Sequence, residues 1–228
     1  MPLANPQLTG SEKLLGKQPK GDSLKYGNLT LGQIEAGINK IGGEEAFLRL
    51  LRGELSVSQP TRSWREENGV IYFSVVSDGT SGKDWIKRLK GKGFRVGYYA
   101  KQVLRSPSFV PTSGVTTEVA VLKGVLFKDN DRMTPKIRAK ADKRKLLKPN
   151  AELACLIREK FTDEEIEAMR LMEIVAMHEP INDSGGNPSL LGADRDDDDR
   201  LLEARSYRND DWWVRDIGFA FAVSSTQA

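Results

Sequence analysis

The C-terminal segment of residues 190–224 constrains this chain most strongly, because it mixes two kinds of side chain in one short stretch. Charged and hydroxyl-bearing residues alternate there with a few large apolar ones. The apolar set comprises Leu190, Leu191, Leu201, Leu202, Trp212, Trp213, Phe219 and Phe221. Side chains of this kind are buried in folded domains, so they can fix the backbone while the polar side chains between them face solvent. The pattern favours a recognition surface presented on a packed frame.

The composition permits a packed domain. The chain has 228 residues, of which 39% are hydrophobic and 29% charged, enough to bury a core. It carries 35 Lys and Arg against 32 Asp and Glu, and this net charge of +3 does not require a polyanionic partner. The single cysteine, Cys155, has no partner for an internal disulfide, and its apolar neighbours predict a buried thiol.

Residues 1–28 are rich in proline and glycine and predict a flexible leader. They contain no apolar core of a signal peptide, which favours a cytoplasmic protein, although surface display by a route without an N-terminal mark stays open. No apolar run approaches the roughly 20 residues of a membrane-spanning helix, so we expect no membrane span.

Residues 29–57 predict a helical hairpin. Leu31, Ile34, Ile38 and Ile41 repeat at spacings of three and four, which is the period of an amphipathic helix. The Gly42-Gly43 pair ends that helix, and a second short apolar stretch follows it. A DNA-binding helix-turn-helix has a similar outline, but a small structural hairpin is the favoured interpretation.

Residues 68–228 predict one α+β domain. The β-branched run of residues 69–79 predicts its first strand, after a connector at 58–69. Helices are expected within 81–93 and 94–106, and the apolar run at 218–223 suits a buried final strand. The first and last strands could pair. Between them we expect an extended stretch at 114–127, a basic and an apolar helix within 131–161, and a strand at 173–181.

Two candidate catalytic or metal sites have simpler interpretations. The acidic run of residues 194–200 could bind a hard cation such as calcium, but it lacks the glycine and the final glutamate of an EF-hand loop, so a solvated loop is favoured. His178 beside Glu179 could form a general base, but a lone histidine in an apolar strand is more often structural. Ser184 lacks a nucleophile elbow, and Gly185-Gly186 is not a phosphate loop. We therefore expect no metal, no cofactor and no catalysis.

Residues 136–148 form the most basic stretch of the chain. On a continuous helix, Lys136, Lys140, Arg144 and Lys148 would line one stripe that could follow a phosphate backbone. The stretch contains no aromatic residue for base stacking, so a solvated helix face is favoured. Nucleic-acid binding through this helix, with residues 29–57, remains the alternative function.

The tail also resembles the variable region of proteins diversified by retroelements, in particular the candidate-phylum bacterial type with a C-type-lectin-like fold. The resemblance rests on the final strand, Ile217-Gly218-Phe219-Ala220-Phe221, which is similar to the aromatic-Gly-aromatic strand that ends those proteins, and on scattered residues that adenine-directed mutagenesis of Asn codons yields. It implies that Leu191, Leu202, Trp212, Phe219 and Phe221 are scaffold. The positions that it implies to be varied are Asp194, Asp196, Asp197, Arg205, Tyr207, Arg208, Asp210, Trp213, Val214 and Ile217.

This resemblance implies a C-type-lectin-like domain with an N-terminal helical appendage. The hypervariable residues would bind a protein or another macromolecule, without a cofactor and without catalysis. Calcium-dependent sugar binding is not implied, because the chain has Glu179-Pro180-Ile181 where that activity needs Glu-Pro-Asn. Of the two adjacent tryptophans, one is expected in the core and the other at the surface as a binding anchor.

Overall fold

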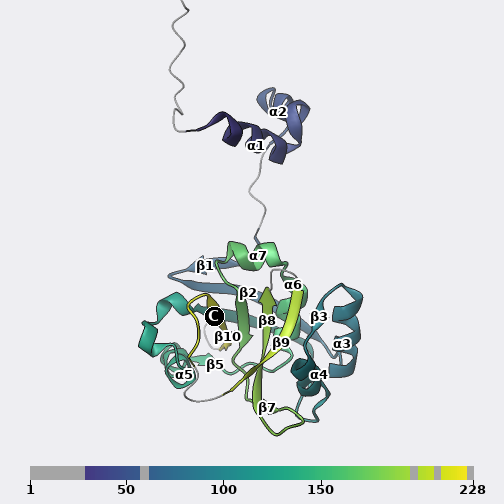
Figure 1. The fold of residues 1–228 in the computed structure, drawn as a ribbon, viewed down its shortest axis with the longest axis vertical. Coiled ribbons are helices and arrows are strands. Elements are labelled where there is room, and N and C mark those ends of the chain that lie inside the picture. Colours follow the sequence, from purple (N-terminus) through teal and green to yellow (C-terminus); the bar gives the residue numbers. More distant parts are fainter. Residues whose placement is uncertain (1–28, 57–61, 196–199, 208–211, 225–228) are drawn as a thin grey trace, which may run out of the picture. The chain divides into compact units, whose positions relative to one another are not determined.

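The computed structural model describes residues 29–56, 62–195, 200–207 and 212–224. The chain divides into two compact units, an N-terminal unit of Met1–Thr61 and a C-terminal unit of Arg62–Ala228 (Figure 1). The C-terminal unit therefore begins within the expected connector at 58–69, ahead of the expected start at residue 68. Within the described residues, no helix has the length and apolarity needed to cross a membrane.

The N-terminal unit contains the two predicted helices, α1 (Leu31–Ile41) and α2 (Gly43–Leu51). Thr30 begins α1 with a capping box, in which its hydroxyl accepts from the amide of Gln33 and the Gln33 side chain accepts from the Thr30 amide. Gly42 separates the helices at a φ of 112°, a conformation that a residue with a Cβ rarely adopts. Local capping and a glycine turn thus define the pair.

The C-terminal unit is built on one mixed sheet of ten strands. The sheet runs in the order β1-β2-β4-β10-β6-β8-β9-β3, with β5 paired to β10 and β7 paired to β8. The β10–β6 and β3–β9 pairs are parallel and the other pairs are antiparallel. The strands are β1 (Arg65–Glu67), β2 (Val70–Asp78), β3 (Arg95–Val96), β4 (Ser113–Lys123), β5 (Leu146–Leu147), β6 (Glu173–Ala176), β7 (Ile181–Asn182), β8 (Pro188–Arg195), β9 (Arg200–Ser206) and β10 (Ile217–Val223).

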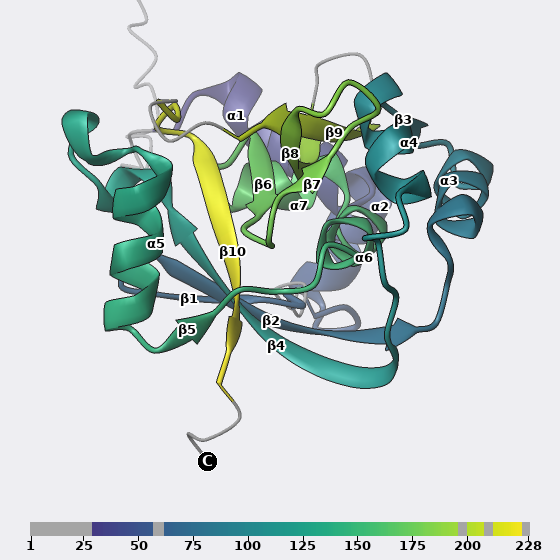
Figure 2. The ribbon, with the colours of Figure 1, turned by 90° about the horizontal axis from the view of Figure 1, so that it is seen from below.

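Helices cover both faces of this sheet (Figure 2), with α5 on one face and α3, α4 and α6 on the other. They are α3 (Gly82–Gly91), α4 (Tyr98–Arg105), α5 (Thr134–Lys143), α6 (Leu153–Lys160) and α7 (Asp163–Ala168), with short 3-10 turns at Gly124–Leu126 and Asp129–Asp131. The α+β class expected from the sequence is confirmed.

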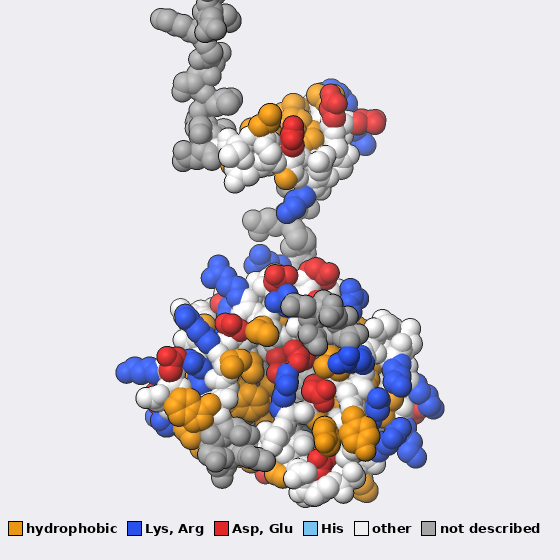
Figure 3. Space-filling model, in the orientation of Figure 1, with side chains coloured by type: hydrophobic (Ala, Val, Ile, Leu, Met, Phe, Trp, Pro, Cys, Tyr) orange, Lys and Arg blue, Asp and Glu red, His pale blue; other side chains and the backbone are white. Residues whose placement is uncertain are grey.

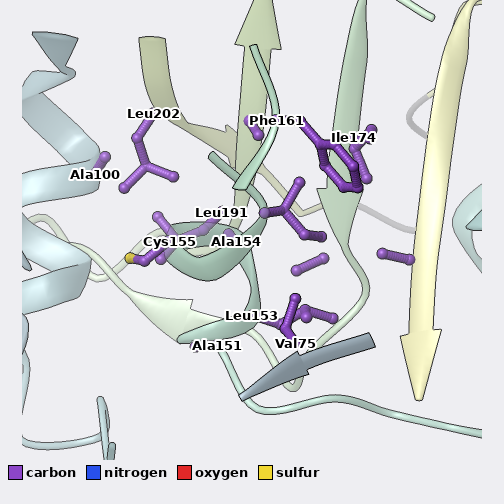
Figure 4. Packing of buried hydrophobic residues seen from close by; sticks show 14 of the residues in the cluster. Val75, Ala100, Ala151, Leu153, Ala154, Cys155, Phe161, Ile174, Leu191 and Leu202 are labelled. Carbon is purple, nitrogen blue, oxygen red and sulfur yellow. The ribbon is translucent and has the colours of Figure 1, made fainter. Parts of the chain in front are cut away.

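Each face of the sheet has its own hydrophobic core, and alternation along the strands separates the two. Ala220 of β10 joins the core under α3, α4 and α6, whereas Phe219 and Phe221 join the core under α5. Figure 4 shows the first core, in which Cys155 is buried together with Leu191 and Leu202. The buried thiol that the apolar neighbours of Cys155 predicted is therefore confirmed. Burial raises the pKa of the Cys155 thiol, so the group stays protonated and unreactive.

Two expectations about strand pairing were wrong. The first and last predicted strands do not pair, because β4 lies between β2 and β10 and hydrogen-bonds to both. The predicted connector at 58–69 contains β1, which forms a hairpin with β2, and Trp64 in it is buried in the first core. The insertion of β4 depends on partners distant in sequence, which leave no local periodicity. The β1–β2 hairpin is local, and its signal, the Asn68-Gly69 turn with both residues at positive φ, was missed.

The continuous basic helix expected over residues 136–148 was also wrong. Helix α5 ends at Lys143, and Lys145 takes a left-handed conformation with a φ of 56°. The chain then enters β5, where Leu146 pairs with Val223 of β10. Packing of the partly buried Leu146 against the core under α5 and its pairing with β10 outweigh the helix propensity of the lysines. The stripe of Lys136, Lys140, Arg144 and Lys148 therefore does not exist as one helical face.

The packing of α3 against α4 generates a stability prediction. A Cβ at Gly82 would lie 1.8 Å from the Leu104 carbonyl oxygen, whereas a Cβ at Gly91 of the same helix would meet nothing within 4 Å. Gly82→Ala should destabilise the protein by about 1 to 3 kcal/mol or more, and Gly91→Ala should stabilise it by about 0.5 to 1 kcal/mol. Denaturant unfolding of the two variants checks this. Equal effects of both substitutions would contradict the close approach of the helices.

Candidate recognition surface

A pocket of about 420 Å³ opens on the sheet where β6, β8 and β9 meet the segment that precedes β10. It is lined by Met172, Glu173, Asp194, Arg195, Arg205, Trp212, Trp213, Val214 and Ile217. Figure 3 shows acidic, basic and hydrophobic side chains interspersed over the face of the C-terminal unit that it displays. The pocket combines the same three kinds of side chain.

The alternation of β8 and β9 places polar side chains in this pocket. Leu191 and Leu202 point into the core beneath the helices. Asp194 and Arg205 have the opposite parity in the paired strands, and their side chains lie on the other face. A single hairpin therefore supplies both an anchoring face and a polar face.

The polar floor of the pocket is an ion cluster. Arg205 donates from Nε to both carboxylate oxygens of Glu173 at 3.0 Å and pairs through Nη2 with Asp194. Glu173 is 2% exposed, so its carboxylate depends on this arginine. Gly192 makes the geometry possible, because a Cβ there would lie 2.1 Å from a Glu173 carboxylate oxygen. The arginine guanidinium is more accessible, with 39% of its side chain exposed.

Burial raises the pKa of the Glu173 carboxyl from 4.5 to about 7. The positive charge of Arg205 acts in the opposite direction, while the negative charges of Asp194 and Glu203 raise the pKa further. The charge on the floor of the pocket therefore changes near neutral pH.

A buried arginine in α6 holds the backbone of a strand that lines the pocket. Arg158 of α6 is fully buried, donates to the Asp194 carbonyl oxygen at 2.8 Å and to the Phe161 carbonyl oxygen at 2.7 Å, and pairs with Asp163 at 2.9 Å. Asp163 also pairs at 3.5 Å with Arg200, the first residue of β9. The end of β8 and the start of β9 are thus both tied to the helical layer.

The two adjacent tryptophans have the reverse of the expected roles. Trp213, expected to be varied at the surface, is 8% exposed, donates from Nε1 to the Thr134 hydroxyl at 2.9 Å and packs edge-on against Phe219. Trp212, expected to be scaffold, is 61% exposed on the pocket rim. Ile217 was also expected to face outward, but it is buried in the α5 core. The expectation that one tryptophan is in the core and one at the surface is confirmed, with the residues exchanged.

The structure brings five of the ten predicted binding residues to this pocket: Asp194, Arg205, Trp213, Val214 and Ile217. Tyr207 lies elsewhere, packed on the α5 core with the guanidinium of Arg138 over its ring. The remaining four, Asp196, Asp197, Arg208 and Asp210, lie outside the described residues.

Sequence reasoning missed Met172, Glu173 and Arg195 as pocket residues. A signal existed for Glu173, because a carboxylate at the start of an otherwise apolar strand must find a partner. Met172 and Arg195 carried no such signal, since an exposed methionine and an arginine at a strand end are ordinary surface features.

His178 and the metal candidates can also be placed. The buried His178 ring accepts at Nε2 from the Leu191 amide at 3.0 Å, and its Nδ1 lies 2.6 Å from the Glu179 carbonyl oxygen, to which it donates. Burial lowers the His178 pKa to about 4, so the ring is neutral and links β8 to the residues after β6. Within the described part of the chain, no three His, Cys, Asp or Glu side chains are grouped to hold a metal ion. Most of the acidic run lies outside that part.

Comparison of the chain with known family models, with curated proteins and with solved structures finds no match.

The raised Glu173 pKa predicts a pH dependence of stability. The folded pKa of about 7 exceeds the ordinary glutamate pKa of 4.5, so the folded state keeps this proton to a higher pH than the unfolded state does. The contribution of Glu173 should therefore decline as pH rises from 4.5 to 7, by on the order of 3 kcal/mol. Glu173→Gln should remove this decline. Unfolding free energies of both proteins across this range check it, and His178 titrates in both, so its effect cancels. Parallel pH profiles would contradict the prediction.

The tryptophan pair predicts very unequal effects of two neighbouring substitutions on stability. Trp213→Ala removes a buried ring and its bond to Thr134, and should cost about 3 to 5 kcal/mol of stability. Trp212→Ala removes an exposed ring and should change stability by less than about 0.5 kcal/mol. Thermal unfolding of both variants is the measurement. Greater destabilisation by Trp212→Ala would show that the buried and exposed residues are misassigned.

Proposed function

We propose that this chain is a ligand-binding protein without catalytic activity, and that its recognition surface is the pocket between β6, β8, β9 and residues 212–217. One observation carries the proposal: strands and a connecting segment that are separate in sequence form one concave surface. Five of the ten predicted binding residues line it, of which Trp213 and Ile217 are buried in its wall. Concave surfaces that combine apolar walls with a few convergent polar groups are typical binding sites.

The chemistry of the rim suits a macromolecular ligand. Trp212 and Val214 are 61% and 57% exposed, and the half-exposed Met172 lies beside them. Arg205 contributes a partly exposed guanidinium. Tryptophan and arginine are the side chains that most often dominate binding energy at protein interfaces, so a protein is the favoured partner.

The arrangement of polar groups argues for binding over catalysis. The pocket lining contains two carboxylates, but both are paired with Arg205, which leaves neither positioned as a base. Among the residues that line the pocket there is no histidine, cysteine or serine to act as a nucleophile or proton carrier.

We further propose that this surface is diversified, as in the retroelement-diversified variable proteins that the tail resembles, on a C-type-lectin-like form of the α+β fold. Support comes from the separation of frame and rim. Leu191, Leu202 and Phe219 are fully buried on strands whose backbones are hydrogen-bonded within the sheet. The rim residues Trp212 and Val214 contribute little to that frame, so they can be exchanged at small cost in stability.

The varied set changes accordingly. Trp212 replaces Trp213 among the exchangeable positions, and the buried Ile217 moves to the frame. Asp194 and Arg205 remain as paired residues whose exchange must preserve the charge balance around Glu173. Asp196, Asp197, Arg208 and Asp210 stay in the set on the sequence pattern.

Selection from two libraries tests the proposal. In the first, Arg208, Trp212 and Val214 are randomised in the displayed full-length chain, and in the matched control Lys83, Lys87 and Lys90 of α3 are randomised. Both are selected against immobilised proteins that are unrelated to one another. The first library should yield binders specific for single targets, because Trp212 and Val214 line a concave site and Arg208 belongs to the varied set by sequence pattern.

The control library should yield none, since the α3 lysines lie on a convex helix surface. A first library that stays resistant to protease but gives no specific binder would contradict the proposal. Diversification is tested separately by the genome. We expect a near-copy of the codons for residues 190–221 close to this gene, differing from it mainly at adenines and lying beside a reverse transcriptase gene.

A further inference from the structure

A second candidate binding surface lies around α5, on lining residues that are all distinct from those of the recognition pocket. It consists of two neighbouring depressions, of about 520 and 380 Å³, that share Lys143. The first is lined by Leu126, Phe127, Lys128, Asp131, Lys136, Ala139, Lys140 and Lys143. The second is lined by Tyr72, Lys143, Arg144, Lys145, Leu146 and Val223. Together these residues are called the α5 surface.

The α5 surface concentrates positive charge. Its lining has six cationic side chains and one carboxylate, that of Asp131, which leaves an excess of five positive charges. The whole chain carries a net charge of only +3, so the rest of the chain is acidic on balance. Asp142 of the same helix lines neither depression. The balanced composition therefore conceals one strongly basic region.

Much of this charge has no internal partner. Lys136 pairs with Asp131 at 2.6 Å, and Lys140 donates to the Leu126 carbonyl oxygen while its ammonium lies over the Phe127 ring. Among the described residues, the side chains of Lys128, Lys143, Arg144 and Lys145 make no hydrogen bond or ion pair, and all four are exposed; these four cations remain available to an anionic ligand.

The geometry suits a chain of phosphates. Lys136, Lys140 and Lys143 follow one face of α5 at spacings of four and three, which extends over about 10 Å of helix axis. The left-handed turn at Lys145 continues the cationic lining into the second depression. A strand with regularly spaced charges can follow two connected depressions, whereas a flat anionic membrane cannot enter them.

The fold also supplies an aromatic side chain, which the basic stretch lacks in sequence. Tyr72 of β2 lines the second depression, with the guanidinium of Arg65 over its ring at 4.7 Å. Arg65 covers one face of the ring, and an aromatic side chain beside a row of cations is typical of grooves that bind single-stranded nucleic acids. We propose that the α5 surface binds the phosphate backbone of a single-stranded nucleic acid, independently of the ligand in the recognition pocket.

Binding of labelled mixed-sequence RNA and DNA oligomers of roughly 15 nucleotides to the full chain, followed by fluorescence anisotropy, tests this proposal. The variant Lys128→Gln/Lys143→Gln/Lys145→Asn removes three unpaired charges, and Asn tolerates the left-handed conformation at position 145. It should bind about tenfold more weakly or worse. The slope of log affinity against log salt should fall in magnitude by about 2, since each contact with a single strand contributes about 0.7.

The matched control is Lys83→Gln/Lys87→Gln/Lys90→Gln on α3, which removes the same net charge from exposed positions on the other face of the sheet. It should retain most of the affinity. Three results would overturn the proposal: no binding at low salt, equal weakening by the control, or binding of a duplex or of polyglutamate as tight as that of the single strand. Preference for RNA or DNA between the two oligomers identifies the kind of strand.

Discussion

The fold depends on strand β10, Ile217–Val223, which hydrogen-bonds to β4, β6 and β5 and is buried on both faces along most of its length. Phe219 and Phe221 fill the core under α5, while Ala220 leaves room for the core on the other face. A strand that joins both cores and both halves of the sheet cannot shift by one residue without exposing those rings. Its position also fixes the residues just before it, and these form one wall of the recognition pocket.

The recognition pocket shows how one hairpin can be both frame and surface. The helix-facing side chains of β8 and β9 are apolar and buried, and the opposite side carries the cluster of Glu173, Asp194 and Arg205. The buried Arg158 fixes the backbone at the end of β8 through a hydrogen bond to a carbonyl group. That contact does not depend on the side chain that residue 194 carries, so the frame tolerates change on the exposed side.

The sequence predicted the features that depend on neighbouring residues. The helical spacing in α1 and α3, the apolar run of β10 and the burial of Cys155 were all legible in the sequence. The insertion of β4 between β2 and β10 was not, because it depends on pairing between distant segments. The sequence also could not show which of two adjacent side chains faces the core. Trp212 and Trp213 are chemically identical, and only the position of the chain against Thr134 and Phe219 determines which ring is buried.

The charge balance exposes a third limit of sequence reasoning. A net charge of +3 did not by itself require a polyanionic partner. Net charge averages over the whole surface, whereas electrostatic attraction acts within a Debye length of roughly 10 Å. The end of α5 at Lys143 broke the predicted stripe but brought Arg144 and Lys145 around a turn next to Tyr72. Tyr72 and the residues that follow α5 line the same depression. An aromatic side chain therefore lies beside the basic stretch, although the lack of one within that stretch had favoured a solvated helix face. Termination of the helix strengthens the case for a phosphate-binding surface, because it converts a straight row of lysines into a concave one.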